Sequence, residues 1–132
     1  MHLIIDGYSK SREILQDEGF LRSWLESYPS EIGMTRISAA FVLKYIGNTL
    51  EDWGISGFVF IAESHISVHT FVEPCYVNID IFSCKDFDTN KAIRDFQQGF
   101  YVIKSRTCLI NREWPLAQPL ASSPKNFVYH GE

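Results

Sequence analysis

The sequence predicts an α+β fold, a two-layer α/β sandwich in which a mainly antiparallel sheet carries two helices on one face. Hydrophobic patterning gives the order β-α-β-β-β-α-β, with three or four consecutive strands between the helices. The 132 residues suffice for one domain, residues 1–132, and leave little room for a second. Two helices on one face leave the other face of the sheet uncovered, so we expect two copies to pair their sheets in a homodimer.

The first half of the chain begins with a short apolar strand, residues 2–6, which Gly7 closes. Residues 9–28 follow as a helix, because apolar positions recur there with roughly helical spacing: Ile14, Leu15, Leu21, Trp24 and Leu25. Gly19 interrupts this pattern, which allows two short helices in place of one. Pro29 is expected to stop the helix, since its ring cannot continue the hydrogen-bond ladder.

The second half is rich in strands. Residues 35–46 are expected to be extended, and three β-branched or aromatic runs follow at residues 55–62, 66–72 and 76–82. A second helix is predicted at residues 90–98, with Asp88 or Thr89 as its cap. Residues 100–110 then form the last strand, and the proline-containing tail, residues 112–132, is expected to be irregular.

Composition excludes several classes of protein. Twelve basic and sixteen acidic residues give a net charge of −4, which argues against a binder of nucleic acid. No apolar run is long enough to cross a bilayer, and charges interrupt the N-terminus before a signal-peptide core can form. The three cysteines are odd in number and include no closely spaced pair, which suits a reducing cytoplasm better than a disulfide framework.

Chemically active residues gather in the segment GISGFVFIAESHISVHTFVEPCYVNIDIFSC, residues 54–84. Glu63, Ser64 and His65 stand between two apolar runs, where a plain polar turn would explain them. That explanation is incomplete, because further polar residues follow inside runs that look buried: His69, Thr70, Glu73, Asp80 and Cys84. Buried ionisable groups are costly unless they are paired or used.

Two common functional patterns fail on spacing. His65 and His69 would bind zinc together on a helix, but this segment resembles a strand, where four residues separate the two rings by roughly 13 Å. We therefore expect no metal site. The Gly54–Gly57 run matches a nucleophile elbow only loosely, because it lacks a spacer residue and no helix follows it.

The segment IAESHISVHT, preceded by WGISGF and followed by Glu73 and VNIDIFSCKDFD, resembles the prokaryotic S-adenosylmethionine decarboxylase proenzyme family. The opening HLIIDGY and the second predicted helix also fit, so the resemblance covers roughly residues 1–101. The combined set of motifs is specific, whereas an isolated Glu-Ser-His would not be.

The resemblance implies a pyruvoyl enzyme that makes its own cofactor. In that family the serine that matches Ser64 attacks the carbonyl of the preceding residue, here Glu63. The chain is then cut between residues 63 and 64, and Ser64 becomes a pyruvoyl group. Such a carbonyl forms a Schiff base with the substrate amine and acts as the electron sink for decarboxylation. The implied product is decarboxylated S-adenosylmethionine, the aminopropyl donor for spermidine.

The resemblance also assigns roles to other residues. His69 and Ser56 match the family's processing histidine and serine, and Cys84 matches the proton donor to the α-carbon. Glu73 matches the glutamate that holds the ribose hydroxyls, and Phe71 and His69 share its strand parity, so the three are expected to line one patch. Glu63 remains as the end of the small fragment, near the charged end of the substrate.

Two departures from the family pattern bear on the substrate. The form HTWPE is here His69-Thr70-Phe71-Val72-Glu73, which keeps an aromatic ring at Phe71. The aromatic residue and proline that usually precede the GVSG-like run are replaced by residues 48–53, NTLEDW, so Trp53 is the candidate to stack on the adenine or the sulfonium. Glu51 and Asp52 would equally suit a basic amino acid such as arginine or ornithine. A non-catalytic homologue that regulates an active partner is the third alternative.

Spacing predicts that the active site is shared between two chains. Ser56 and Ser64 are eight residues apart, which is roughly 26 Å in an extended strand. Either the strand bends sharply or the two serines of one site belong to different chains. We expect the second, with Ser56, His69 and Glu73 of one protomer facing Ser64 and Cys84 of its partner.

Overall fold

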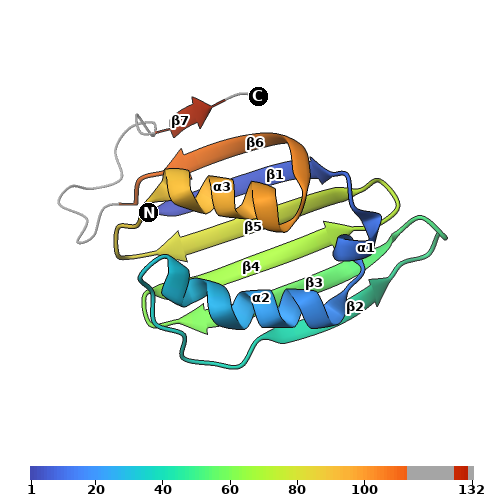
Figure 1. The fold of residues 1–132 in the computed structure, drawn as a ribbon, viewed down its shortest axis with the longest axis horizontal. Coiled ribbons are helices and arrows are strands. Elements are labelled where there is room, and N and C mark those ends of the chain that lie inside the picture. Colours follow the sequence, from blue (N-terminus) through green and yellow to red (C-terminus); the bar gives the residue numbers. More distant parts are fainter. Residues whose placement is uncertain (113–126, 131–132) are drawn as a thin grey trace.

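The computed structural model describes residues 1–112 and 127–130. Its strands are β1 (His2–Ser9), β2 (Phe41–Ile46), β3 (Trp53–Ile61), β4 (Ser64–Phe71), β5 (Tyr76–Ser83), β6 (Val102–Ile110) and β7 (Phe127–His130), and its helices are α1 (Arg12–Leu15), α2 (Glu18–Glu31) and α3 (Thr89–Gly99). The strands form one antiparallel sheet in the order β2-β3-β4-β5-β1-β6-β7. Helices α2 and α3 lie side by side on one face of it (Figure 1). This arrangement confirms the predicted α+β sandwich, with four strands between the two long helices.

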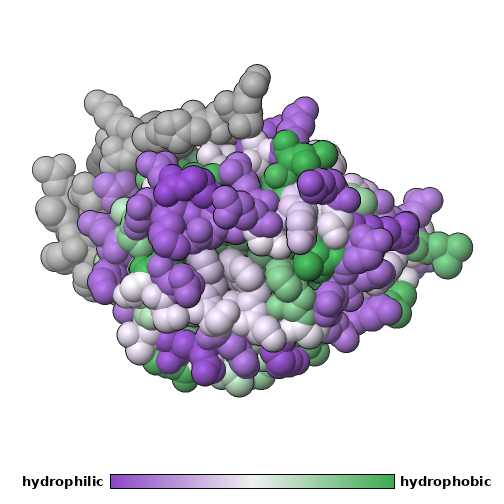
Figure 2. All heavy atoms as spheres, viewed as in Figure 1, coloured by the Kyte–Doolittle hydropathy of each residue, from purple (hydrophilic) through white to green (hydrophobic). Residues whose placement is uncertain are grey.

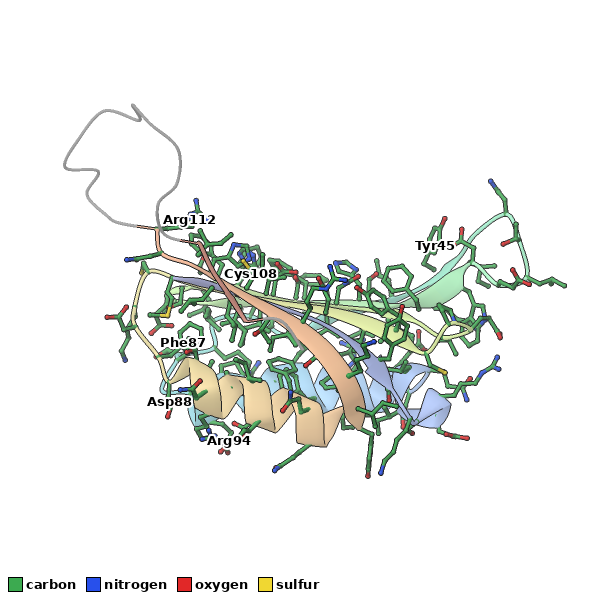
Figure 3. All side chains as sticks on the ribbon, turned by 90° about the horizontal axis from the view of Figure 1, so that it is seen from above. Tyr45, Phe87, Asp88, Arg94, Cys108 and Arg112 are labelled. Carbon is green, nitrogen blue, oxygen red and sulfur yellow. The ribbon has the colours of Figure 1, made fainter. Side chains whose placement is uncertain are left out.

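The two faces of the sheet differ in character, because side chains alternate along each strand. In β5, Val77, Ile79 and Ile81 are fully buried beneath the helices, whereas Asn78 and Asp80 point to the other side and are half-buried. Figure 3 shows the sheet on edge, with the helices on one side and the Cys108 side chain on the other. No helix among the described residues covers that second side, which we call the open face.

Helix α2 packs closely on the sheet because Gly57 has no side chain. A Cβ atom at Gly57 would lie 2.6 Å from Leu25 Cδ1 and 2.9 Å from Leu21 Cδ2, both closer than carbon atoms approach one another. Trp24 of α2 stacks on Tyr28 and also contacts Phe96 of α3, which joins the two helices in one core. Burial of this core holds the helices against one face of the sheet and leaves the open face without a helical cover among the described residues.

The helical segment in the first half differs from the prediction at both of its breaks. It does contain two helices, but they separate at Gln16 and Asp17, where the Asp17 carboxylate caps α2 by accepting from the Phe20 N–H at 2.8 Å. Gly19 lies inside α2. Pro29 also lies inside α2 and does not stop it, because a proline in the last turn removes only its own hydrogen bond. The chain leaves the helix at Gly33, whose φ of 73° favours glycine.

The predicted strand at residues 35–46 is shorter than expected, since β2 begins only at Phe41. The preceding residues are held by α2 and β3 instead. The Ala40 carbonyl accepts from Arg22 at 2.6 Å, its N–H donates to Glu26 at 3.1 Å, and the Ile37 N–H donates to the Phe60 carbonyl at 3.0 Å. The backbone N–H and carbonyl of Ala40 are thus bonded to side chains of α2 and not to a neighbouring strand.

The expected irregular tail contains a strand. Phe127–His130 form β7, which pairs with the outer edge of β6 and places Phe127 opposite Ile110. An edge strand presents unpaired N–H and carbonyl groups, and a short returning segment satisfies them. Residues 113–126 and 131–132 of the predicted tail lie outside the described residues.

The helix-covered side of the molecule is largely hydrophilic, with apolar residues scattered between the hydrophilic ones (Figure 2). Three side chains of β2 are more than half exposed on the open face, namely Phe41, Leu43 and Tyr45. In the part of the chain that the structure describes, helices are too short or too polar to cross a membrane.

Candidate active site

Ser56 and His69 form the first group of candidate residues. They lie opposite each other in the register of β3 and β4, and 2.8 Å separates Ser56 Oγ from His69 Nδ1. His69 is exposed on the open face rather than buried in the core. Asn78 follows in the same row of the sheet, and its amide donates to Asp6 at 2.5 Å. A histidine bonded to a hydroxyl and open to solvent can both accept and donate a proton.

Glu63, Ser64 and Cys84 form the second group, at the opposite end of the same strands. The turn between β3 and β4 contains Glu63, and Ser64 is the first residue of β4, opposite Ser83. The backbone N–H of Cys84 donates to the Glu63 carbonyl oxygen at 3.0 Å. In the self-cleavage that the family resemblance implies, this carbonyl is the one attacked, and a hydrogen bond from a fixed N–H stabilises negative charge that develops on a carbonyl oxygen.

The backbone around Ser64 is compatible with a cut before it. β4 pairs with β3 on one side and with β5 on the other, so a new terminus at Ser64 would stay held in the sheet. The Glu63 side chain accepts from the Thr35 N–H at 3.1 Å, which fixes the other end of the cut. These residues therefore fit a pyruvoyl group derived from Ser64.

The two groups lie far apart within one chain. The chain reverses at residues 62–63, which corrects the picture of one extended strand through both serines. Nevertheless Ser64 lies opposite Ile61, five residues along β3 from Ser56, which corresponds to about 17 Å. His69 is paired with Ser56 and is equally distant from Ser64. Cys84, by contrast, is bonded through its backbone N–H to Glu63, the residue before Ser64.

Glu73 lies in the turn between β4 and β5 and forms a third group with Trp53 and Arg12. Its Oε1 accepts from Trp53 Nε1 at 2.9 Å and pairs with the Arg12 guanidinium of α1. Phe71 and Glu73 line one cavity of about 620 Å³, together with Thr49, Glu51, Asp52 and Pro74. His69 is not among those lining residues, because β4 ends at Phe71 and the turn breaks the strand parity that joined the three in the sequence.

The Trp53 ring is already in contact with neighbouring side chains. Trp53 and Ile55 are two residues apart on β3, so both lie on the side of the strand that faces the helices. The Lys44 ammonium stands over its ring, 4.9 Å from the centroid. Its indole N–H is taken by Glu73. One face of the ring and its only polar group are therefore already occupied.

His65 is a candidate residue whose surroundings the sequence did not reveal. Its ring stacks on Phe58 with 5.2 Å between centroids and meets the edge of Phe82 at 5.6 Å. Burial among these rings lowers the pKa of His65, and nearby His2 lowers it further. The three rings come from β3, β4 and β5, so only the register of the sheet brings them together.

The last candidate residues are histidines and cysteines, the residue types that bind metals or form disulfides. His65 and His69 both lie on β4, and no cluster of three metal-ligating side chains occurs within residues 1–112. The thiols of Cys75, Cys84 and Cys108 are all free. Cys84 is exposed, and the other two are half-buried.

Comparison with known proteins gives a consistent result. A family model described as S-adenosylmethionine decarboxylase matches residues 1–113. A protein of Archaeoglobus fulgidus named S-adenosylmethionine decarboxylase proenzyme is 30% identical over 112 residues, which is 84% of this chain and 95% of the relative. A protein of the same name from Clostridium botulinum (strain Loch Maree / Type A3) is 33% identical and covers 79% of this chain and 85% of its own.

The match covers less than two thirds of the length of some other relatives. The proenzyme of Synechococcus sp. (strain WH7803) is 35% identical over 85 residues, 64% of this chain, and the match spans only 62% of that relative. Among solved structures, the adenosylmethionine decarboxylase of Aquifex aeolicus VF5 is similar, with a TM-score of 0.67 and 21% identity over 85% of this chain and 92% of that one. At this identity the likeness concerns the fold.

Proposed function

The chain belongs to the S-adenosylmethionine decarboxylase family, and from this premise we propose that it cuts itself before Ser64 and then decarboxylates S-adenosylmethionine in the cytoplasm. The product would be the aminopropyl donor for spermidine. The observation that carries the proposal is the hydrogen bond from the Cys84 N–H to the Glu63 carbonyl, beside Ser64. It joins the scissile carbonyl, the attacking serine and the proposed proton donor in one place.

Self-cleavage would begin when Ser64 Oγ attacks the Glu63 carbonyl carbon. The Cys84 N–H would stabilise the resulting oxyanion, and the peptide C–N bond would then break to leave an ester. Loss of the Ser64 α-proton and cleavage of its Cβ–O bond would release Glu63 as a carboxylate. Water would finally displace the terminal nitrogen as ammonia, leaving a pyruvoyl group on the larger fragment.

Ser56 and His69 would handle protons during this sequence. His69 is accessible from the open face and bonded to the Ser56 hydroxyl, so it can accept a proton and pass one on. Since both lie about 17 Å from Ser64 of the same chain, we assign them to the Ser64 of a second copy. The Ser56–His69 side of one protomer would then meet the Ser64 end of the other, and each site would take residues from both.

Exposed apolar side chains support this homodimer. Phe41, Leu43 and Tyr45 of β2 lie on the open face, where water would otherwise surround them, and Leu43 is opposite Ser56. A second copy would cover these side chains and complete the site at the same time. No membrane or nucleic acid takes part in this proposal.

Turnover would use the same two groups together with the cavity. A pyruvoyl carbonyl supplies the electron sink for decarboxylation. Cys84, whose backbone N–H contacts the Glu63 carbonyl and whose thiol is exposed, would donate a proton to the substrate carbon after carbon dioxide leaves. Glu73 would accept hydrogen bonds from the ribose hydroxyls, and Phe71 would contact the nucleoside from the same cavity.

A second candidate substrate rests on two further residues of the cavity. Glu51 and Asp52 line it beside Glu73, and their carboxylates would attract the cationic side chain of arginine or ornithine. The reaction and its cofactor would be the same. The sulfonium of S-adenosylmethionine is also cationic, so only a direct comparison of substrates separates the two.

Denaturing mass spectrometry and carbon dioxide release test the proposal. The purified chain should give a small fragment ending at Glu63 and a larger one blocked by pyruvoyl, and Ser64→Ala should remain uncut. Ser67→Ala, on the same strand, is the matched control and should be cut. Labelled carbon dioxide should come from S-adenosylmethionine and not from arginine or ornithine. An intact wild-type chain would instead indicate a non-catalytic homologue that regulates an active partner.

A further inference from the structure

Among residues 1–112, the donors to the Glu73 carboxylate all bind one of its two oxygens. Trp53 Nε1 donates to Oε1 at 2.9 Å, and the Arg12 guanidinium donates to the same Oε1. Within residues 1–112, no side chain or backbone group donates to Oε2. A carboxylate with one oxygen fixed by two donors keeps its orientation, while the second oxygen retains its capacity to accept.

The three residues come from parts of the chain that are separately anchored. Arg12 belongs to α1, Trp53 to β3, and Glu73 to the turn after β4. Buried Thr70 of β4 ties α1 to the sheet, because its hydroxyl donates to the Leu15 carbonyl at 2.7 Å and accepts from the Ile55 N–H at 2.9 Å. The position of Arg12 relative to Glu73 is therefore set by the fold, although the Arg12 side chain itself is about half exposed.

We infer that Arg12 and Trp53 are positioning residues that hold Glu73 so that Oε2 serves the ligand in the cavity of about 620 Å³. Glu73 is then a preoriented acceptor for a hydroxyl or ammonium donor. This inference rests on the proposed function, in which Glu73 binds the nucleoside of the substrate. It assigns a role to Arg12 and replaces the stacking role of Trp53 by a hydrogen bond.

Preorientation predicts an effect on substrate binding and none on self-cleavage. Arg12→Gln and Trp53→Phe each remove one donor to Oε1 and leave Ser56, Ser64 and His69 untouched. Each should raise KM for S-adenosylmethionine by about tenfold, the effect of losing one hydrogen bond to a charged group. The change in kcat should be smaller, and the extent of self-cleavage should match the wild type. Arg12→Lys should restore part of the loss, because it returns a positive charge without the planar fork.

A double-mutant cycle distinguishes positioning from a general structural effect. In a Glu73→Gln background, Arg12→Gln should change KM by less than twofold, because the residue through which it acts has already been altered. Arg94→Gln is the matched control, since Arg94 lies exposed on α3 on the far side of the helices (Figure 3), and it should leave KM unchanged. Trp24→Phe removes an indole N–H from a tryptophan that packs on Tyr28 and not on Glu73, so it is the control for Trp53→Phe and should also leave KM unchanged.

Three results would overturn the inference: an unchanged KM in Arg12→Gln, an equal fold-change with and without Glu73, or a wild-type KM in Trp53→Phe. The last would return Trp53 to a stacking role, in which phenylalanine replaces it. The proposed function is judged separately, from wild-type cleavage and wild-type turnover. If the wild type prefers arginine, the same cycle measured on arginine decides the positioning role.

Discussion

Ser56 and His69 face each other across β3 and β4, with 2.8 Å between the hydroxyl oxygen and the ring nitrogen Nδ1. Both lie on the face of the sheet that no described helix covers. In the proposed function this pair exchanges protons with a group of a second copy. Ser64 of the same chain is too far along the strands to be that group.

The first prediction concerns this pair. His69→Ala should slow self-cleavage by about a hundredfold, the usual contribution of one acid–base group, and Ser56→Ala should slow it less. The double variant should be little worse than His69→Ala, because the two side chains act together. A time course of fragment formation by denaturing mass spectrometry measures these rates. Normal cleavage in His69→Ala would remove the histidine from the mechanism.

Cys84 should separate processing from turnover. Its backbone N–H, which any residue but proline retains, contacts the Glu63 carbonyl, while its side chain is exposed. Cys84→Ala should therefore still be cut, yet release carbon dioxide at least about a hundredfold more slowly because the proton donor is missing. Cys108→Ala removes a half-buried thiol on the open face and serves as the control. Full turnover in Cys84→Ala would require another donor.

Mixing two inactive chains tests the shared site. A Ser64→Ala chain and a His69→Ala chain each lack one half of the cleavage chemistry. In a mixed dimer with shared sites, the intact Ser64 of the His69→Ala chain would face the intact His69 of its partner. Coexpression should therefore restore cleavage of the His69→Ala chain, at up to the fraction of mixed dimers.

Two outcomes would argue against sharing. One is the absence of any rescue in coexpressed chains whose mixed assembly is verified by their mass. The other is full self-cleavage activity by a wild-type monomer in dilute solution. Either result would mean that one chain brings Ser56 and Ser64 together, against the register of β3 and β4.

The surroundings of His65 predict a dependence of stability on pH. Burial against Phe58 and Phe82 lowers the pKa of His65 in the folded chain below its ordinary value of 6.5. The unfolded chain then binds the proton more readily, so stability falls as pH drops below about 6.5 and stops falling below the folded pKa. Replacement by phenylalanine keeps a ring and removes the titration.

This dependence is measured by urea unfolding in the uncut Ser64→Ala background. His65→Phe should reduce the loss of stability between pH 7 and pH 5, and the two chains should respond alike between pH 7 and pH 8. An identical acid response of both chains would mean that His65 is not the group that titrates.

Several structural features were predictable from the sequence because they depend on local pattern. Period-two alternation along residues 76–82 is enough to assign the faces of β5, in which Asn78, Asp80 and Phe82 lie on the side away from Val77, Ile79 and Ile81. The predicted α+β sandwich is confirmed. The break after α1 was misplaced because Gly19 is a weak helix former, whereas the Asp17 cap decides where α2 begins.

Other features depend on contacts between distant segments. The late start of β2 results from the hydrogen bonds that Arg22 and Glu26 of α2 make to Ala40. The aromatic surroundings of His65 need the register of three strands. Strand β7 forms because β6 would otherwise expose an edge, which no pattern within residues 127–130 reveals.

The sequence by itself determined which residues are candidates for chemistry, because the motif around Glu-Ser-His specifies residue types in a fixed order. It also determined that Ser56 and Ser64 do not meet in one extended strand, since backbone length sets that limit. Only the tertiary structure decided the contacts within the groups: the hydrogen bond of Ser56 with His69, that of the Cys84 N–H with the Glu63 carbonyl, and the separation of Glu73 from His69 into a group with Arg12 and Trp53. The physical reason is that these groups arise from strand register and from the docking of α1, and both are settled by burial of the whole core.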